Sequence, residues 1–252
     1  MLGPDQGFGT LQVEAPTGVK PSFGTASRFA RDIASLQRRS VAGLVRDASI
    51  DYDHYAPAYP RQRQADHRIA ARVHAALGDA RTVVNVGAGS GSYEPEDRYV
   101  LAVEPSTGMR AQRPRYLAPA IIASAEALPL DEHTFEAAMA LVTIRHWSDP
   151  AAGLRELRRV ARGPVVVLTF DVDVLADFWM LKDYLPEALA DDRLRFPTID
   201  AITAILGDAR VEPVPIPADC TDGFLEAHYA RPEAYLDPTV RWSTSRHARH
   251  GD

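Results

Sequence analysis

Short apolar runs alternate with amphipathic segments through the middle of the chain. The clearest runs are rich in β-branched residues and read TVVNVGA at 82–88 and PVVVLTF at 164–170. Between them, apolar residues at helical spacing predict a helix over 149–161. Strands that are apolar throughout and alternate with helices are typical of a parallel sheet covered on both faces. The sequence therefore predicts an α/β fold with a doubly wound, mostly parallel sheet.

The other predicted elements follow from the same patterns. They are strands at 100–103, 120–123, 135–144 and 209–216, and helices at 64–80, 174–190, 198–206 and 224–236. Prolines at 213, 215 and 217 favour an edge position for the last of these strands, because proline cannot donate to a sheet ladder.

The chain divides into three predicted parts. Residues 1–46 form a flexible N-terminal extension, since the first 26 are rich in Gly, Pro and Thr. Within it, 27–46 has arginines among apolar residues and is either a basic amphipathic helix that contacts a partner or membrane surface, or a marginal, disordered segment. Residues 47–172 form a cofactor-binding core. Residues 173–252 belong to the same domain and carry substrate-side helices and an edge strand.

Composition narrows the class of protein. The 252 residues are 46% hydrophobic and 25% charged, as in a folded globular protein. The formal net charge of −6 disfavours general binding of nucleic acid. A single cysteine, Cys220, excludes an internal disulfide framework and a multi-cysteine zinc site. There is no apolar run of about 18 residues and no secretory signal, so we expect a cytoplasmic protein that does not span a membrane.

The strongest motif is a glycine-rich loop that follows the first strand directly. The loop reads Gly87-Ala88-Gly89-Ser90-Gly91, and Glu104 ends the next strand 17 positions after Gly87. Glycines let the backbone bend tightly and approach a ligand. In a doubly wound sheet both features lie at the carboxyl edge of the strands, where ligands bind. There the Glu104 carboxylate can accept hydrogen bonds from both hydroxyls of a ribose.

Two cofactor classes use such a loop. A nicotinamide or flavin site requires G-x-G-x-x-G, with a helix N-terminus that binds the pyrophosphate. Here the third glycine comes one position early, and Ser92 stands at the expected glycine position. The spacing G-x-G-x-G, with polar Asn85 two positions before the first glycine, resembles class I S-adenosylmethionine-dependent methyltransferases.

Two further segments extend the resemblance over about residues 50–172. Residues 124–130 read SAEALPL, and the fourth strand ends at Thr143-Ile144-Arg145-His146-Trp147, which is similar to the type 11 small-molecule methyltransferase group. The resemblance implies a Rossmann-like fold, S-adenosyl-L-methionine as cofactor, and transfer of its methyl group to a small-molecule acceptor by in-line displacement.

The resemblance also implies a set of cofactor-binding residues. They are Asn85, Gly87, Ala88, Gly89, Gly91, Glu104, Ala125, Glu126, Thr143 and Tyr52. Ala125 and Glu126 border the adenine in such enzymes, although Glu126 could instead only cap a turn. Tyr52, with Tyr55 and Tyr59, lies in a segment that folds over the cofactor as a lid in the family, or is simply a packed N-terminal arm.

The sequence departs from the family pattern in two ways. Asn85 stands where the family usually carries an acid, which removes charge attraction to the cofactor's ammonium or sulfonium group. A seventh, antiparallel strand normally lies beside the sixth, but 237–252 contains no convincing apolar strand. There are three alternatives: either the C-terminus is truncated, or another segment takes that place in the sheet, or the sheet is incomplete.

Candidate chemistry beyond the cofactor is sparse. His146 is the best candidate for a general base, but it could instead pack the loop against the cofactor. Asp171 and Asp173 follow the fifth strand, where turn caps are more common than metal ligands, so no metal site is predicted. Aromatic residues after the fifth strand form either a wall for the acceptor or ordinary core. These residues are Phe178, Trp179, Tyr184 and Phe224.

Three functions remain open from the sequence. The first is a small-molecule methyltransferase that acts on oxygen, nitrogen or carbon. The second is a catalytically silent cofactor-binding or interaction protein, suggested by Asn85 and the missing strand. The third is an NAD(P)-dependent oxidoreductase, suggested only by the glycine loop. No Asn-Pro-Pro-aromatic sequence follows the fourth strand, which argues against methylation of nucleic-acid bases. The oligomeric state is not predicted.

Overall fold

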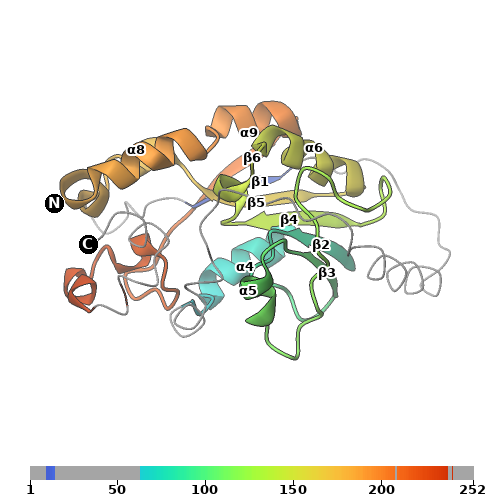
Figure 1. Ribbon diagram of the computed structural model, residues 1–252, viewed down its shortest axis with the longest axis horizontal. Helices are drawn as coiled ribbons and strands as arrows, with labels where there is room; N and C mark the ends of the chain where they lie inside the picture. The colour runs from blue at the N-terminus through green and yellow to red at the C-terminus, as the bar shows by residue number, and fades with distance from the viewer. Residues whose placement is uncertain (1–9, 15–62, 208, 238–239, 241–252) are drawn as a thin grey trace.

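The computed structural model describes residues 10–14, 63–207, 209–237 and 240, which form a single open sheet with helices against it (Figure 1). The sheet has six strands in the order β3-β2-β4-β5-β1-β6. The strands are β1 (Thr10–Glu14), β2 (Thr82–Val86), β3 (Tyr99–Val103), β4 (Ala137–Leu141), β5 (Val165–Phe170) and β6 (Arg210–Val214).

Four neighbouring strands are parallel and form the centre of the core. β2 pairs in parallel with β3 and β4, and β4 pairs in parallel with β5. Nearly all their residues are buried, in agreement with the β-branched runs of the sequence. Because the four strands run the same way, the residues that follow them meet at one edge of the sheet.

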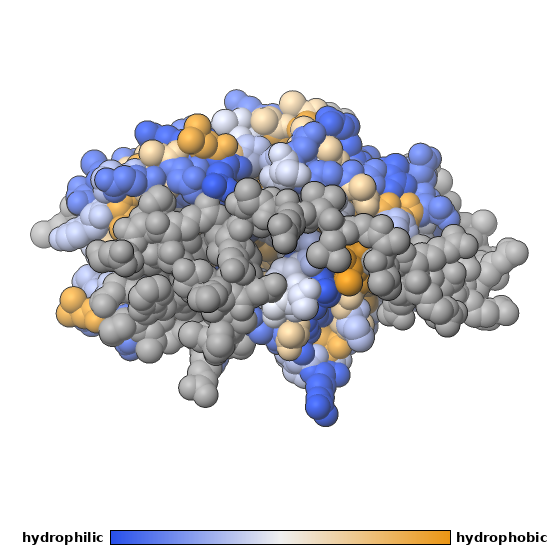
Figure 2. Space-filling view, in the orientation of Figure 1, coloured by the Kyte–Doolittle hydropathy of each residue, from blue (hydrophilic) through white to orange (hydrophobic). Residues whose placement is uncertain are grey.

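Helices cover both faces of the sheet, as the alternating pattern predicts. Figure 1 shows α6 (Pro150–Val160), α8 (Pro186–Arg195) and α9 (Ile199–Leu206) on one side of the sheet, and α4 (His67–Ala76) and α5 (Thr107–Ala111) on the other. The remaining helical turns are short. They are η1 (Ile144–His146), α7 (Val172–Leu175), η2 (Met180–Tyr184), η3 (Leu225–His228) and η4 (Pro232–Leu236). On the visible face, the described surface is mostly hydrophilic with separate apolar patches (Figure 2).

The position of the final antiparallel strand is taken by the N-terminal β1. β1 pairs antiparallel with β5 on one side and with β6 on the other. Thr10–Glu14 therefore differ from the loose tail that the glycines and prolines predict. Of the three explanations for the missing C-terminal strand, the structure shows that another segment takes its place. β6 lies at the sheet edge, as its prolines predict.

Three predicted elements differ from the structure, and proline accounts for much of the difference. The third strand is reduced to a single bridge between Ile121 and Val103, since Pro119 breaks the approach to it. The helix expected at 174–190 is split, because Pro186 starts a new helix after Leu185 leaves helical geometry. The helix expected at 224–236 is two separate 3₁₀ turns, the second of which begins at Pro232.

Removal of β1 should destabilise the protein. We expect truncation of residues 1–14 to lower the free energy of unfolding by roughly 3 kcal/mol relative to truncation of residues 1–9, because β5 and β6 each lose a full ladder of hydrogen bonds. Urea denaturation of the two truncated proteins measures the difference. Equal stabilities would contradict the sheet order.

Candidate functional site

The glycine loop closes onto the neighbouring strand as soon as β2 ends. The backbone N–H groups of Gly87 and Ala88 both donate to the carbonyl oxygen of Val103, at 2.9 and 3.0 Å. The amide of Gly91 donates to the carbonyl of Ala88 at 2.9 Å, which makes the loop a tight turn. The loop therefore lies across the carboxyl ends of β2 and β3.

Glu104 points toward this loop. Its Oε2 accepts a hydrogen bond from the Gly89 amide at 2.8 Å, and its Oε1 accepts one from the Ser106 amide at 2.8 Å. Burial raises the pKa of the Glu104 carboxyl above its ordinary value, although these two amides partly offset the shift. The glycine-rich turn and the carboxylate that follows the next strand are thus in contact, as the sequence predicts.

Thr143 brings the end of β4 to the same place. A Cβ added to Gly87 would lie 2.0 Å from Thr143 Oγ1, and Gly87 has φ +71°. Val142, just before it, has φ +54°, which is rare for a β-branched residue and common near functional sites. Three strand ends therefore converge on the loop.

The connection from β2 to β3 contains no helix. Residues 87–98 are all described, and they form turns and bends before β3 begins. A dinucleotide site needs a helix N-terminus after the glycine loop to bind the pyrophosphate. This loop lies beside a carboxylate but has no helix end, which suits a nucleoside without a pyrophosphate.

Ala125 and Glu126 lie next to the loop that follows β4. Ala125 is buried near Gly153, where an added Cβ would lie 3.2 Å from its Cβ and 2.4 Å from the ring of Trp147. Glu126 Oε1 accepts from the amide and hydroxyl of Ser148 at 2.8 and 3.0 Å. The pKa of Glu126 is lowered, because these and other hydrogen bonds to the carboxylate outweigh its burial. These contacts match a turn cap, and an adenine contact stays a prediction.

Asn85 takes part in a buried polar network that the sequence did not reveal. Its Nδ2 donates to Glu94 Oε1 at 2.9 Å. Glu94 also forms a two-pronged ion pair with Arg113, with N···O distances of 3.0 and 2.8 Å. The proximity of Glu94 to the glycine motif was the available signal, whereas only the fold brings Arg113 to this place.

His146 lies where the sequence predicts, in the 3₁₀ turn after β4, and is half-buried. The neighbouring Arg145 is buried and pairs with Asp192 of α8 at 2.8 Å. Its guanidinium carbon also lies 5.1 Å from the centroid of the Phe196 ring. The loop that carries His146 is therefore joined to α8 by a buried ion pair.

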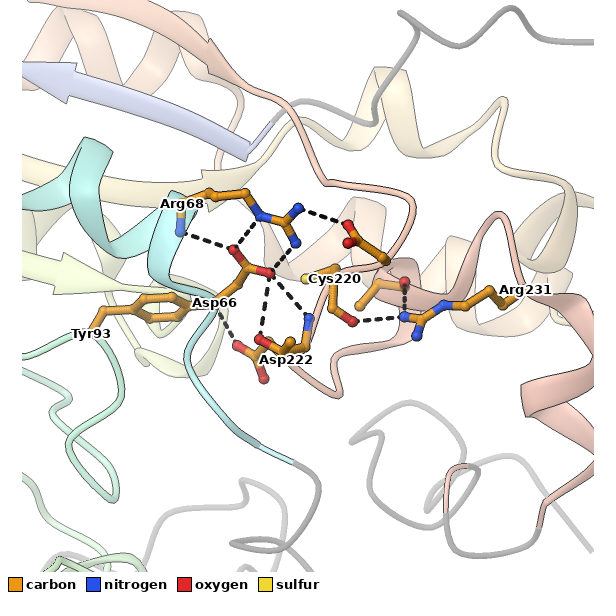
Figure 3. Close-up of polar contacts among 9 residues, drawn as sticks. Asp66, Arg68, Tyr93, Cys220, Asp222 and Arg231 are labelled. Atoms are coloured by element: carbon orange, nitrogen blue, oxygen red, sulfur yellow. Dashed lines mark hydrogen bonds and ion pairs between the residues drawn. The ribbon is translucent and has the colours of Figure 1, made fainter.

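The C-terminal segment is attached to the glycine loop through Tyr93. The Tyr93 hydroxyl donates to the Asp222 carboxylate (Figure 3). That carboxylate also pairs with Arg63 at 2.6 Å. Asp66, the N-cap of α4, accepts from the Thr221 amide at 3.1 Å. Burial raises the pKa of Tyr93, and the Asp222 carboxylate raises it further. The contacts join residues far apart in sequence beside the loop.

The remaining candidate residues of the sequence analysis are the tyrosines before the first helix and the aspartates after β5. Tyr52, Tyr55 and Tyr59 lie outside the described residues. Asp171 caps α7 by accepting from the Asp173 amide at 3.0 Å, and no cluster of three metal-ligating side chains occurs among the residues that the structure describes.

The aromatic residues after β5 also divide. Phe178 and Phe224 are core, Trp179 is half-buried, and Tyr184 is 68% exposed. The acceptor wall predicted from them is therefore reduced to Trp179 and Tyr184.

Comparisons with known proteins agree with this geometry. The "Methyltransferase domain" family matches residues 84–167. The demethylmenaquinone methyltransferase of Corynebacterium urealyticum is 30% identical over 167 residues, which cover 62% of this chain and 72% of that protein. The chain belongs to the class I S-adenosylmethionine-dependent methyltransferases.

Solved structures of other methyltransferases share the fold of this chain. An Anabaena variabilis protein assigned as a methyltransferase of an antibiotic biosynthesis pathway is 31% identical, with a TM-score of 0.67 over 75% of this chain and 81% of its own. Phosphoethanolamine N-methyltransferase 2 of Haemonchus contortus, solved with S-adenosyl-L-methionine, has a TM-score of 0.50 at 15% identity, over 61% of this chain and 40% of its own.

The family membership decides between the cofactor classes. S-adenosylmethionine is the cofactor of this methyltransferase, and the oxidoreductase interpretation of the glycine loop is wrong. The site fits the cofactor's nucleoside, because it presents a buried carboxylate beside a glycine-rich turn. Among the described residues, every helix is too short or too polar to cross a bilayer.

Replacement of Gly87 should be much more damaging than replacement of another glycine with the same backbone conformation. We expect Gly87→Ala to lower the free energy of unfolding by about 3 kcal/mol or more, because its Cβ would overlap Thr143. Gly78→Ala is the matched control: φ is +56°, nothing lies within 4 Å, and the expected loss is about 1 kcal/mol. Thermal and urea denaturation compare the two, and equal losses would contradict the packing against Thr143.

Proposed function

We propose that this methyltransferase binds S-adenosylmethionine at the carboxyl edge of β2, β3 and β4 and transfers its methyl group to a small-molecule acceptor. The observation that carries the proposal is the 2.8 Å contact between the Glu104 carboxylate and the Gly89 amide. The contact puts an acceptor of hydroxyl protons beside Gly89, which has no side chain to block a ligand. Such a pair of features suits a ribose.

In this proposal each strand end supports one part of the cofactor. Glu104 accepts hydrogen bonds from the two ribose hydroxyls, which are donors of matching chemistry. Gly87, Ala88, Gly89 and Gly91 supply the backbone surface under the nucleoside. Glu126 and the buried Ala125 lie toward the adenine, and Asn85 and Thr143 lie toward the methionine end.

The reaction needs little from the protein beyond alignment. When bound, the cofactor would supply a methyl group on a positively charged sulfur. A lone pair or π electrons of the acceptor could then bond to that carbon while the carbon–sulfur bond breaks and leaves a neutral thioether. A proton leaves the acceptor if the methylated atom is a protonated oxygen, nitrogen or carbon. The protein must hold the nucleophile, methyl group and sulfur in line and exclude water. In this proposal His146, in the turn after β4, takes that proton or packs the loop.

Two lines of support favour a small acceptor. The two relatives at about 30% identity are a demethylmenaquinone methyltransferase and a protein of an antibiotic pathway, both of which concern small molecules. Beyond β5, Trp179 is half-buried and makes edge contacts with Tyr184 and Tyr235, at ring centroid distances of 5.8 and 5.7 Å. An aromatic group of this kind suits an apolar or aromatic acceptor.

Replacement of Glu104 tests the cofactor site. We expect the full chain to bind S-adenosylhomocysteine and not NADH in isothermal titration calorimetry. Glu104→Gln should weaken the binding of S-adenosylhomocysteine by about 10-fold to 100-fold, since a hydrogen bond to a charged group contributes about 1.5–3 kcal/mol. Glu96→Gln is the matched control, because Glu96 is exposed in the same connection.

The outcomes separate the competing functions. Release of S-adenosylhomocysteine with any member of a panel of small acceptors supports catalysis. Cofactor binding without turnover on every acceptor would favour the catalytically silent protein. An unchanged affinity of Glu104→Gln would contradict the ribose assignment.

Cofactor binding should be linked to release of a proton. The raised pKa of Glu104 means that part of the free protein carries a neutral carboxyl at mildly acidic pH. Ribose hydroxyls donate to the ionised form, so cofactor binding lowers the pKa of Glu104. The affinity for the cofactor therefore rises with pH over the range in which the Glu104 carboxyl of the free protein loses its proton. The same raised pKa makes ionisation of Glu104 cost stability in the free protein as the pH rises.

Calorimetry near pH 5 in two buffers with different ionisation enthalpies measures the proton release. The signal should disappear in Glu104→Gln and persist in Glu96→Gln. A binding enthalpy that is independent of the buffer in the unaltered protein would contradict the linkage.

A further inference from the structure

The glycine loop rests on a buried ion pair where other folds of this kind place a helix. Glu94 and Arg113 are 2% and 4% exposed, and both guanidinium Nη atoms contact the carboxylate. Arg113 also donates to the carbonyl oxygens of Ala118 at 2.9 Å and Gly89 at 3.4 Å. A Cβ on Gly91 would lie 3.2 Å from Arg113 Nη1. The pair therefore supports the underside of the loop directly.

The same carboxylate fixes the orientation of the Asn85 amide. Glu94 Oε1 lies 2.9 Å from Asn85 Nδ2, and an ionised carboxylate only accepts hydrogen bonds, so the nitrogen must face it. The oxygen Oδ1 is consequently turned away from Glu94. Within the described residues this oxygen is buried and has no hydrogen-bond partner. A buried acceptor without a donor costs about 1–3 kcal/mol, which a ligand that brings a donor would recover.

We propose that Glu94 and Arg113 are positioning residues for the methionine end of the cofactor: Glu94 holds the Asn85 amide so that Oδ1 accepts a hydrogen bond from the cofactor's α-ammonium. The inference rests on the proposed cofactor site. Arg113 neutralises the Glu94 charge, so the network presents a neutral acceptor at this position. The carboxylate of this network comes from the loop, nine positions after Asn85.

The inference makes an unusual prediction about the residue that the family normally carries. An aspartate at position 85 would place a second carboxylate about 2.9 Å from Glu94 Oε1, and two carboxylates at that distance cannot both ionise. Asn85→Asp should therefore weaken binding of S-adenosylhomocysteine by about tenfold or more at pH 8. The deficit should shrink as the pH falls, because the two carboxyls can then share a proton.

A double-mutant cycle on the full chain tests the coupling. Asn85→Asp, Glu94→Gln and the double variant are titrated with S-adenosylhomocysteine, and their melting temperatures are measured in parallel. In the double variant the amide stands at position 94 and the carboxylate at position 85, so the hydrogen bond between the two positions is restored. The double variant should therefore bind S-adenosylhomocysteine about tenfold more tightly than Asn85→Asp alone. The exposed Glu96→Gln provides the control, because its effect should add to that of Asn85→Asp without coupling.

A second probe separates ligand contact from general stability. 5′-Methylthioadenosine contains the nucleoside and sulfur but has no ammonium group. Asn85→Ala should weaken binding of S-adenosylhomocysteine by about tenfold and leave the affinity for 5′-methylthioadenosine within about twofold. If Asn85→Asp does not fold, this comparison still decides the inference.

Each outcome has one meaning. Three results overturn the positioning role if the unaltered protein still binds S-adenosylhomocysteine. They are tighter binding of that ligand by Asn85→Asp, additive effects of Asn85→Asp and Glu94→Gln, and an equal loss of affinity for both ligands in Asn85→Ala. Failure of the unaltered protein to bind that ligand removes the proposed function itself.

Discussion

The site depends on one hydrogen bond between residues that follow two neighbouring strands, from the Gly89 amide to the Glu104 carboxylate. The contact requires β2 and β3 to be parallel and in register, so that a loop and an acidic residue leave the sheet at the same edge. It also requires that nothing stand between them, which the glycines ensure. The carboxylate is buried and therefore costly to ionise, and in the proposed complex two ribose hydroxyls would offset that cost.

Buried charges recur around this edge and join it to the rest of the chain. Glu94 with Arg113 supports the loop, Arg145 with Asp192 joins the turn after β4 to α8, and Asp222 receives Tyr93 and Arg63. The pairs contribute little net stability, because desolvation offsets most of their attraction. Their geometric requirements are strict, however, and a reaction that depends on alignment benefits from a rigid frame.

The final strand shows how a fold tolerates a change of connectivity. A central position between β5 and β6 must be filled, since both would otherwise present unpaired backbone groups. The direction of pairing depends on backbone geometry and not on which end of the chain supplies the strand. Thr10–Glu14 can therefore take the antiparallel position between β5 and β6, although they come from the N-terminal part of the chain.

The sequence by itself determined the parallel core, the glycine loop and its acidic partner, because these depend on local periodicity and on residues that adjoin strand ends. It also identified Thr143 and His146 by their place after β4. Only the tertiary structure decided what supplies the last strand, the single bridge at Ile121, and the network of Asn85, Glu94 and Arg113. Such contacts join residues distant in sequence, and their side chains carry no periodic signal; they form only once the packed sheet has set the distances between them.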